Sequence, residues 1–181
     1  MSFITKLQNT LGSSPKLVFI KNYIGLIPLK FVSRKSLAKR SFSQFGEDLD
    51  ISLFFEDSHN NGFYVDVGSN HPTKLSNTYR LYLNGMRGIC IDPNQTLLDL
   101  HKIVRPDDIL VPVAIGPKAS MEKFYEMSYH ALSSFSLKEA NYWVDKGLSI
   151  IRETFKPVLP LSLVIESCSK SFEGDFNFLS I

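Results

Sequence analysis

The hydrophobic pattern after residue 41 alternates between helical spacing and short apolar runs. Phe45, Leu49 and Leu53 recur every fourth position, which predicts a helix over residues 44–56 with these side chains directed inward. Four apolar runs bounded by turn residues predict buried strands, at residues 63–67, 88–91, 109–115 and 176–181. Helical spacing separates the first three runs, at residues 76–84 and 95–104. This alternation predicts an α/β domain with a Rossmann-like, doubly wound, mostly parallel sheet.

The pattern between residues 118 and 170 is less regular. Residues 122–127 predict a strand that forms a hairpin with the third strand, and residues 137–146 have helical spacing. Residues 161–165 fit either a strand or the start of a helix. The last run, 176–181, predicts a fourth core strand with nothing after it to cover its edge. We therefore expect a domain that is truncated after its fourth core strand.

Charge divides the chain near Ser41. Residues 1–40 contain eight of the 20 basic residues and none of the 18 acidic ones, although the net charge of the whole chain is only +2. This segment predicts a basic N-terminal arm, followed by an incomplete domain at 41–181. The arm fits a short extension packed on its own domain, or a weak contact with a membrane surface or an acidic partner.

Composition narrows the class of protein. With 44% apolar and 21% charged residues, the chain has enough apolar side chains for a core. The near-neutral charge argues against nucleic-acid binding, and no apolar run reaches the roughly 18 residues that span a bilayer. Cys90 and Cys168 predict buried thiols of an intracellular, cytoplasmic protein. The four histidines lack the spacing of metal ligands, so no metal site is expected.

Two carboxylates fall near the carboxyl ends of the first two strands, where open parallel sheets bind ligands. Asp66 lies two residues before Gly68, and Asp92 ends the second strand at a separation from Gly68 close to the ~20 residues typical of a ribose-binding acid. A carboxylate there can accept hydrogen bonds from both ribose hydroxyls. The other interpretations are a structural role for Asp66 and a turn role for Asp92 before Pro93.

The glycines distinguish between cofactors. A dinucleotide site uses three glycines in the pattern G-x-G-x-x-G, whereas Gly68 is followed by Ser69, Asn70 and His71 without another glycine. This favours a nucleoside cofactor without phosphate, such as S-adenosylmethionine. His71 fits either a general base or a polar surface residue, and Asn77 either a ligand contact or a helix N-cap.

Several ordered motifs over residues 41–181 resemble FkbM-type S-adenosylmethionine-dependent methyltransferases. The motifs are Ser43-Gln44-Phe45-Gly46-Glu47-Asp48, Phe63-Tyr64-Val65-Asp66-Val67-Gly68-Ser69-Asn70-His71-Pro72, Ser76-Asn77-Thr78-Tyr79, Gly85-Met86-Arg87-Gly88-Ile89, Ile91-Asp92-Pro93, Arg105-Pro106-Asp107-Asp108 and Phe178-Leu179-Ser180-Ile181. Met86 stands where the family usually has Trp, and the family pattern continues beyond the point where this chain ends.

The resemblance implies a class I methyltransferase fold and methyl transfer to a hydroxyl, often on a sugar or secondary metabolite. The acceptor would thus be a small molecule or a glycan. Matched by position, a cofactor loop would comprise Asp66, Gly68, Ser69 and Asn70, with Asp92 on the ribose. Gln44, Glu47, Asn77 and Thr78 would lie near the same pocket. The matching motifs identify no catalytic base. The alternatives are a truncated, inactive fragment and a dinucleotide-dependent oxidoreductase, the latter disfavoured by the missing glycines.

Overall fold

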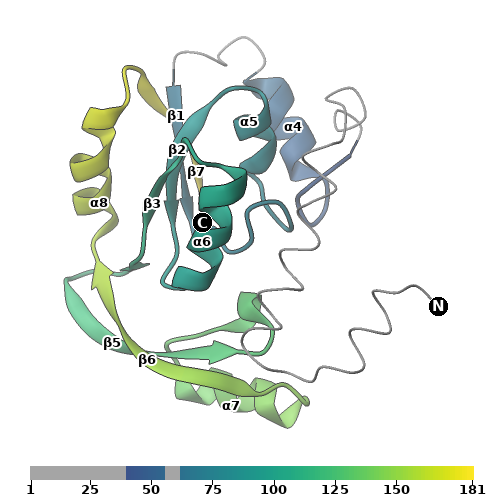
Figure 1. Ribbon diagram of the computed structural model, residues 1–181, viewed down its shortest axis with the longest axis vertical. Coiled ribbons are helices and arrows are strands. Elements are labelled where there is room, and N and C mark those ends of the chain that lie inside the picture. The colour runs from purple at the N-terminus through teal and green to yellow at the C-terminus, as the bar shows by residue number, and fades with distance from the viewer. Residues whose placement is uncertain (1–39, 56–61) are drawn as a thin grey trace. The chain divides into compact units, whose positions relative to one another are not determined.

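A computed structural model of the chain describes residues 40–55 and 62–181 (Figure 1). The predicted arm therefore lies outside the described residues, apart from Arg40. Contacts divide the described chain into a larger unit, residues 40–123 with Phe155–Ile181, and a smaller unit, Phe124–Thr154. No helix within the described ranges is long and apolar enough to cross a bilayer.

The larger unit contains a four-stranded parallel sheet. Its strands are β1 (Gly62–Val67), β2 (Arg87–Ile91), β3 (Ile109–Val111) and β7 (Asp175–Ser180), in the order β3-β2-β1-β7. Each neighbouring pair is parallel. The larger unit is thus α/β, as predicted, and its strand order is compatible with a Rossmann-like fold.

Helices lie on both faces of this sheet (Figure 1). The faces follow from the alternation of side chains along β1. Phe63 and Val65 pack with Val164 of α8 (Leu161–Cys168), whereas Tyr64 packs on the opposite face with Leu81 of α5 (Tyr79–Leu83). A further helix, α6 (Gln95–Val104), spans the predicted residues and begins where the Asn94 side chain accepts the Thr96 N–H at 3.1 Å.

The prediction of one strand over residues 109–115 is wrong, because β3 ends before Pro112. Proline has no N–H to donate to a ladder, and the Val113 N–H turns back to the Val111 carbonyl oxygen at 2.9 Å. The chain continues as β4 (Ala114–Ile115), which belongs to a second sheet of order β4-β6-β5. In that sheet β6 (Ile150–Leu159) lies between β4 and β5 (Ser120–Met127), so the predicted hairpin is also wrong.

The first predicted helix forms as α4 (Glu47–Phe54), but the predicted inward face is wrong. Phe45 and Leu53 are 82% and 65% exposed, while Asp48 is fully buried. The Asp48 carboxylate accepts the Ser41 hydroxyl at 2.6 Å and pairs with the Arg80 Nε at 3.0 Å. Burial acts to raise the pKa of Asp48, but hydrogen bonds led by the one from Ser41 outweigh this effect and lower it.

The last predicted strand forms as β7, but most of its side chains are not buried. Phe176 and Leu179 are 45% and 37% exposed, and only Ser180 is buried within the strand. The reason is that β7 pairs with β1 on one side and is the last strand of the described sheet. Residues 161–165, for which the sequence left strand and helix open, begin α8.

The smaller unit carries α7 (Leu137–Asp145), which confirms the helix predicted for 137–146, and the short helix η1 (His130–Leu132). Its core contains Tyr125, Met127 and Ala140. Here β5 contributes a buried Glu126, whose Oε2 pairs with the Arg152 Nη2 at 3.0 Å. A second short helix, η2 (Ser169–Ser171), follows α8 in the larger unit.

Candidate functional site

The strand order of the sheet reverses between β1 and β7. The chain leaves β1 toward β2 and β3 on one side, and later returns to form β7 on the other side of β1. Ligands of open parallel sheets bind beyond the carboxyl ends of the strands at such a reversal. The predicted residues Gly68, Ser69 and Asn70 follow β1 directly, Asp92 follows β2, and Ser180 ends β7.

Three consecutive backbone N–H groups of the loop after β1 donate hydrogen bonds to the carboxyl end of β2 and to the residue after it. The Gly68 and Ser69 N–H groups both donate to the Ile91 carbonyl oxygen, at 2.9 and 3.1 Å. The Asn70 N–H donates to the Asp92 Oδ2 at 2.9 Å. Gly68 has a φ of +69°, and space around its Cα is open, so the left-handed backbone is what favours glycine there.

The Asp92 carboxylate joins two loops. Its Oδ2 accepts from Asn70 and its Oδ1 accepts the Asn94 N–H at 2.7 Å, while the residue is buried. Each oxygen therefore accepts one backbone amide, and a carboxylate oxygen can accept a second hydrogen bond. Burial raises the pKa of Asp92 to about 6, against the opposing effect of the Asn94 and Asn70 hydrogen bonds.

His101 of α6 also contacts the loop after β1, through the Asn70 carbonyl oxygen. The sequence analysis did not predict this contact. Its Nε2 lies 3.0 Å from the Asn70 carbonyl oxygen, which can only accept, so Nε2 carries the proton. The ring is fully buried, and burial followed by the Arg105 charge lowers the pKa of His101 to about 3. The helical pattern of 95–104 placed this residue on a helix but gave no sign that it reaches the loop.

We expect His101→Gln to reduce the acid sensitivity of the fold. Because the folded-state pKa of His101 is about 3 and its ordinary value is 6.5, the unfolded chain binds a proton between these pH values that the folded chain does not. Wild-type stability should therefore fall, relative to the variant, by about 1.4 kcal/mol for each pH unit below 6.5. Urea unfolding of both proteins at pH 7, 6, 5 and 4 measures this difference, and parallel stability curves would contradict it.

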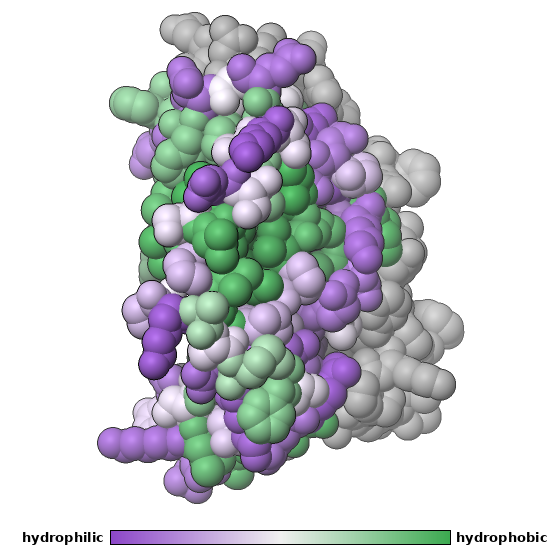
Figure 2. Space-filling model, turned by 90° about the vertical axis from the view of Figure 1, so that its left-hand side faces the viewer, coloured by the Kyte–Doolittle hydropathy of each residue, from purple (hydrophilic) through white to green (hydrophobic). Residues whose placement is uncertain are grey.

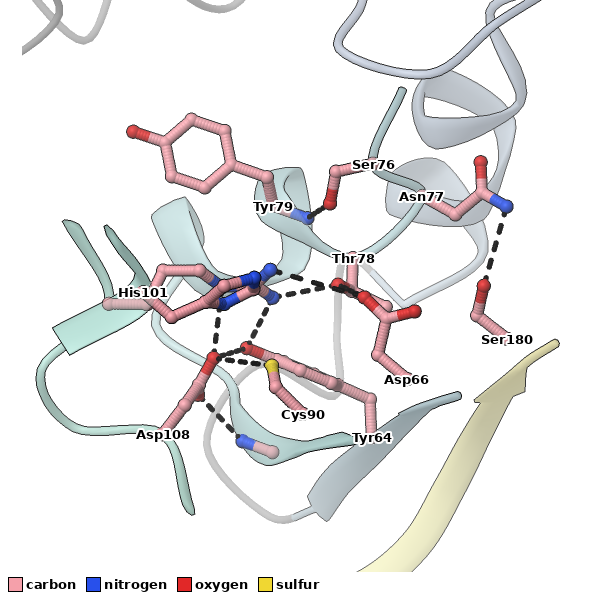
Figure 3. A network of polar contacts seen from close by, with 12 residues as sticks. Tyr64, Asp66, Ser76, Asn77, Thr78, Tyr79, Cys90, His101, Asp108 and Ser180 are labelled. Atoms are coloured by element: carbon pink, nitrogen blue, oxygen red, sulfur yellow. Dashed lines mark hydrogen bonds and ion pairs between the residues drawn. The ribbon is translucent and has the colours of Figure 1, made fainter. Parts of the chain in front are cut away.

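Behind the loop lies a buried network centred on Arg105, part of which Figure 3 shows. The Arg105 Nη2 donates to the Thr78 Oγ1 at 2.7 Å and to the Tyr64 hydroxyl oxygen at 2.9 Å. The Thr78 hydroxyl in turn donates to the Asp66 Oδ2, which lies 4.0 Å from the Arg105 Nη1. Burial raises the pKa of Asp66, and the Arg105 charge opposes this rise. The network thus ties β1 to the start of α5.

Asp108 completes the network at the start of β3. Its Oδ2 lies 2.9 Å from the Arg105 Nε and accepts the Tyr64 hydroxyl at 2.6 Å. Its Oδ1 accepts the Gly88 N–H of β2 at 2.9 Å. Sequence reasoning found Arg105 and Asp108 only as part of a family motif, because their partners lie on other elements. These contacts make the network a buried set of charges that joins β1 and β2 to the start of α5, the end of α6 and the start of β3.

The hydrogen bonds of Asp66 agree with the structural role that the sequence left open. Its side chain points toward Thr78 (Figure 3), and its Oδ2 accepts from that side chain rather than from an amide of the Gly68 loop. The partner of this carboxylate is thus the start of α5, not the loop after β1. The carboxylate instead lies between the Arg105 network and Ser180, its register partner on β7.

Two further residues were predicted for the site, Asn77 and Gln44, and neither has a described hydrogen bond to the loop after β1. The Asn77 Nδ2 donates to the Ser180 Oγ at 3.4 Å, so Asn77 lies at the carboxyl end of β7 (Figure 3). Asn77 is not the side-chain cap of α5, because the Ser76 Oγ accepts the Tyr79 N–H at 3.1 Å. Gln44 is exposed in the segment before α4, and no described hydrogen bond links it to the loops after β1 and β2.

His71 is buried, so its interpretation as a surface residue is wrong. Its Nδ1 accepts the Thr73 and Lys74 N–H groups, at 3.1 and 3.2 Å. This nitrogen is therefore deprotonated and shapes the loop that leads toward α5. Across the described ranges, 40–55 and 62–181, no three His, Cys, Asp or Glu side chains are grouped to hold a metal ion.

The chain was compared with protein-family models, with curated proteins and with solved structures. No family model, no curated protein and no solved structure matches this chain.

Proposed function

We propose that the chain is an S-adenosylmethionine-dependent methyltransferase with a doubly wound, class I methyltransferase sheet, acting on a hydroxyl of a sugar or secondary metabolite. Three features support this proposal together. The strand order reverses at β1, a left-handed glycine follows β1, and a buried carboxylate that accepts two loop amides follows β2. Their positions agree with the ordered motifs of the sequence.

The observation that carries the proposal is that the N–H groups of the loop after β1 already donate hydrogen bonds within the protein. A pyrophosphate is bound by free N–H groups of a glycine-rich loop and of the helix that the loop opens. Here the amides of Gly68, Ser69 and Asn70 already donate to Ile91 and Asp92. The next helix, α5, begins only at Tyr79. This arrangement favours a nucleoside that meets Asp92 through its ribose over a dinucleotide that needs those amides.

The chain's own residues would bind and orient the reactants. Asp92 would accept the ribose hydroxyls, and the Gly68–Asn70 loop would border the cofactor beside the Asn77–Ser180 pair. The cofactor supplies an electrophilic methyl group, so the protein mainly has to align the acceptor oxygen and exclude water. We assign no general base, because no described side chain is placed against an acceptor.

Asp92→Ala is expected to weaken S-adenosylmethionine binding by about tenfold or more, because hydrogen bonds to a charged acceptor contribute about 1.5–3 kcal/mol each. Calorimetric titration of the full chain measures this change. Wild-type affinity should also decrease below pH 6, where Asp92, with a pKa of about 6, takes up a proton.

Asp99→Ala is the matched control, because Asp99 is a half-exposed acid on α6 that pairs with Lys102 at 3.1 Å. Circular dichroism of each variant checks that the loss of the Asn70 and Asn94 contacts has not unfolded the domain. Equal affinities for wild type and a folded Asp92→Ala variant would remove Asp92 from the site. Saturable binding of NADH without binding of S-adenosylmethionine would favour the oxidoreductase alternative.

A further inference from the structure

The outward side of α4 is apolar, but it also carries a negative charge. Leu53 and Phe54 are 65% and 82% exposed, Leu49 is partly exposed, and Asp50 lies exposed between them on the helix surface. The opposite side of α4 is used inside the larger unit, through Asp48, Ile51 and the following Phe55. We name the surface formed by Leu49, Asp50, Leu53 and Phe54 the outer face of α4.

The composition of this face indicates the chemistry of its partner. Large apolar side chains that remain exposed on one helix side are typical of a contact surface. Asp50 within the face and Glu47 at its edge would repel an anionic lipid surface but attract a basic partner. Hydrogen bonds to backbone groups lower the pKa of Glu47, which favours its charged form. A complementary partner is therefore both apolar and basic.

Such a segment precedes α4 in the chain, separated from it by residues 40–46. Residues 30–39 contain four basic side chains and no acidic one, together with Phe31, Val32 and Leu37. The segment is followed by Arg40, the first residue that the structure describes, whose carbonyl oxygen accepts from the Arg80 Nη2. The same Arg80 pairs with Asp48 of α4. The first described residue after this segment is thus held near the side of α4 that carries Asp48.

The available length is sufficient for contact along the whole helix. Ten extended residues span up to about 33 Å, whereas an eight-residue helix is about 12 Å long. We propose that the outer face of α4 is the docking surface for the basic segment 30–39 of the same chain. Apolar burial of Leu53 and Phe54 provides the main attraction, and Asp50 and Glu47 select the basic segment. This inference does not depend on the proposed methyltransferase activity.

Limited trypsin digestion of the full chain tests the proposal, because trypsin cleaves after Lys30, Arg34, Lys35 and Lys39. Docking protects these bonds, so Asp50→Lys and Leu53→Ser should each increase their cleavage rate by about tenfold. Glu166→Lys, the same charge change at an exposed position of α8, should leave the rate unchanged. Cleavage after Lys123 and Arg152 reports any general unfolding of a variant.

Equal cleavage of the segment in wild type, Asp50→Lys and Leu53→Ser would overturn the proposal. Protection of that equally cleaved segment only after vesicles containing phosphatidylserine are added would assign it to an anionic membrane surface rather than to α4.

Discussion

Replacing Arg105 with Met is expected to lower the free energy of unfolding by about 3–5 kcal/mol, the range measured when one partner of a buried ion pair is removed. Arg105 is fully buried and makes contacts with four side chains of the network. Its loss leaves Asp108 without a cation, and Asp66 without the charge that opposes its burial. Chemical denaturation followed by circular dichroism measures the loss.

Arg87→Met is the control for this experiment. Arg87 is a partly exposed arginine whose pairing with Asp107, at 3.2 Å, lies at the surface. Its removal should change stability by no more than about 1 kcal/mol. If Arg105→Met does not fold, Arg105→Lys, which keeps a charge but loses the forked donors, should give a measurable intermediate loss. Equal effects of Arg105→Met and Arg87→Met would show that the buried network contributes little.

Gly88→Ala should be the second severe substitution, with an expected loss of at least about 3 kcal/mol from overpacking and from a broken buried hydrogen bond. A Cβ on Gly88 would lie 2.1 Å from the Cδ2 of Tyr64 and 2.5 Å from the Tyr64 carbonyl oxygen. The ring would have to move, and its hydroxyl would then leave Asp108. The carbonyl cannot move without distorting the pairing of β1 with β2.

The control for Gly88→Ala is Gly147→Ala. Gly147 has open space around it, but its φ of +92° makes any side chain strained. We expect that variant to lose only about 1 kcal/mol. Thermal unfolding of both variants at one pH gives the comparison. A Gly88→Ala protein as stable as Gly147→Ala would mean that the Tyr64 ring has room to move.

The sequence predicted the elements well because their signals are local. The runs at 63–67 and 88–91 have apolar residues bounded by turns, and both form parallel strands as expected. The break at Pro112 was missed because the apolar run continues through it. Only the lack of a proline N–H, together with a second sheet that can pair with Ala114, separates β3 from β4.

Side-chain environments were harder to predict, because distant residues determine them. In and around α4 two sets of positions have helical spacing: Phe45, Leu49 and Leu53, and Asp48, Ile51 and Phe55. The second set faces the larger unit, where Asp48 pairs with Arg80, and Ile51 and Phe55 pack in the cluster of Tyr64 and Leu81. His101 and Asp108 likewise reveal their roles only when α6 and β3 are folded against β1. For the candidate site, the sequence could predict that Asp92 and the Gly68 loop both follow carboxyl ends of strands, but not that the Asn70 N–H donates to Asp92.

The double attachment of Asp92 has a consequence for the thermodynamics of binding. Because this carboxylate already holds the amides of Asn70 and Asn94, the loops after β1 and β2 are ordered when the protein folds. The conformational entropy of these loops is therefore lost during folding and not when a ligand arrives. A ligand that reaches Asp92 meets a preorganised acceptor, and its binding free energy is not reduced by the cost of closing a loop.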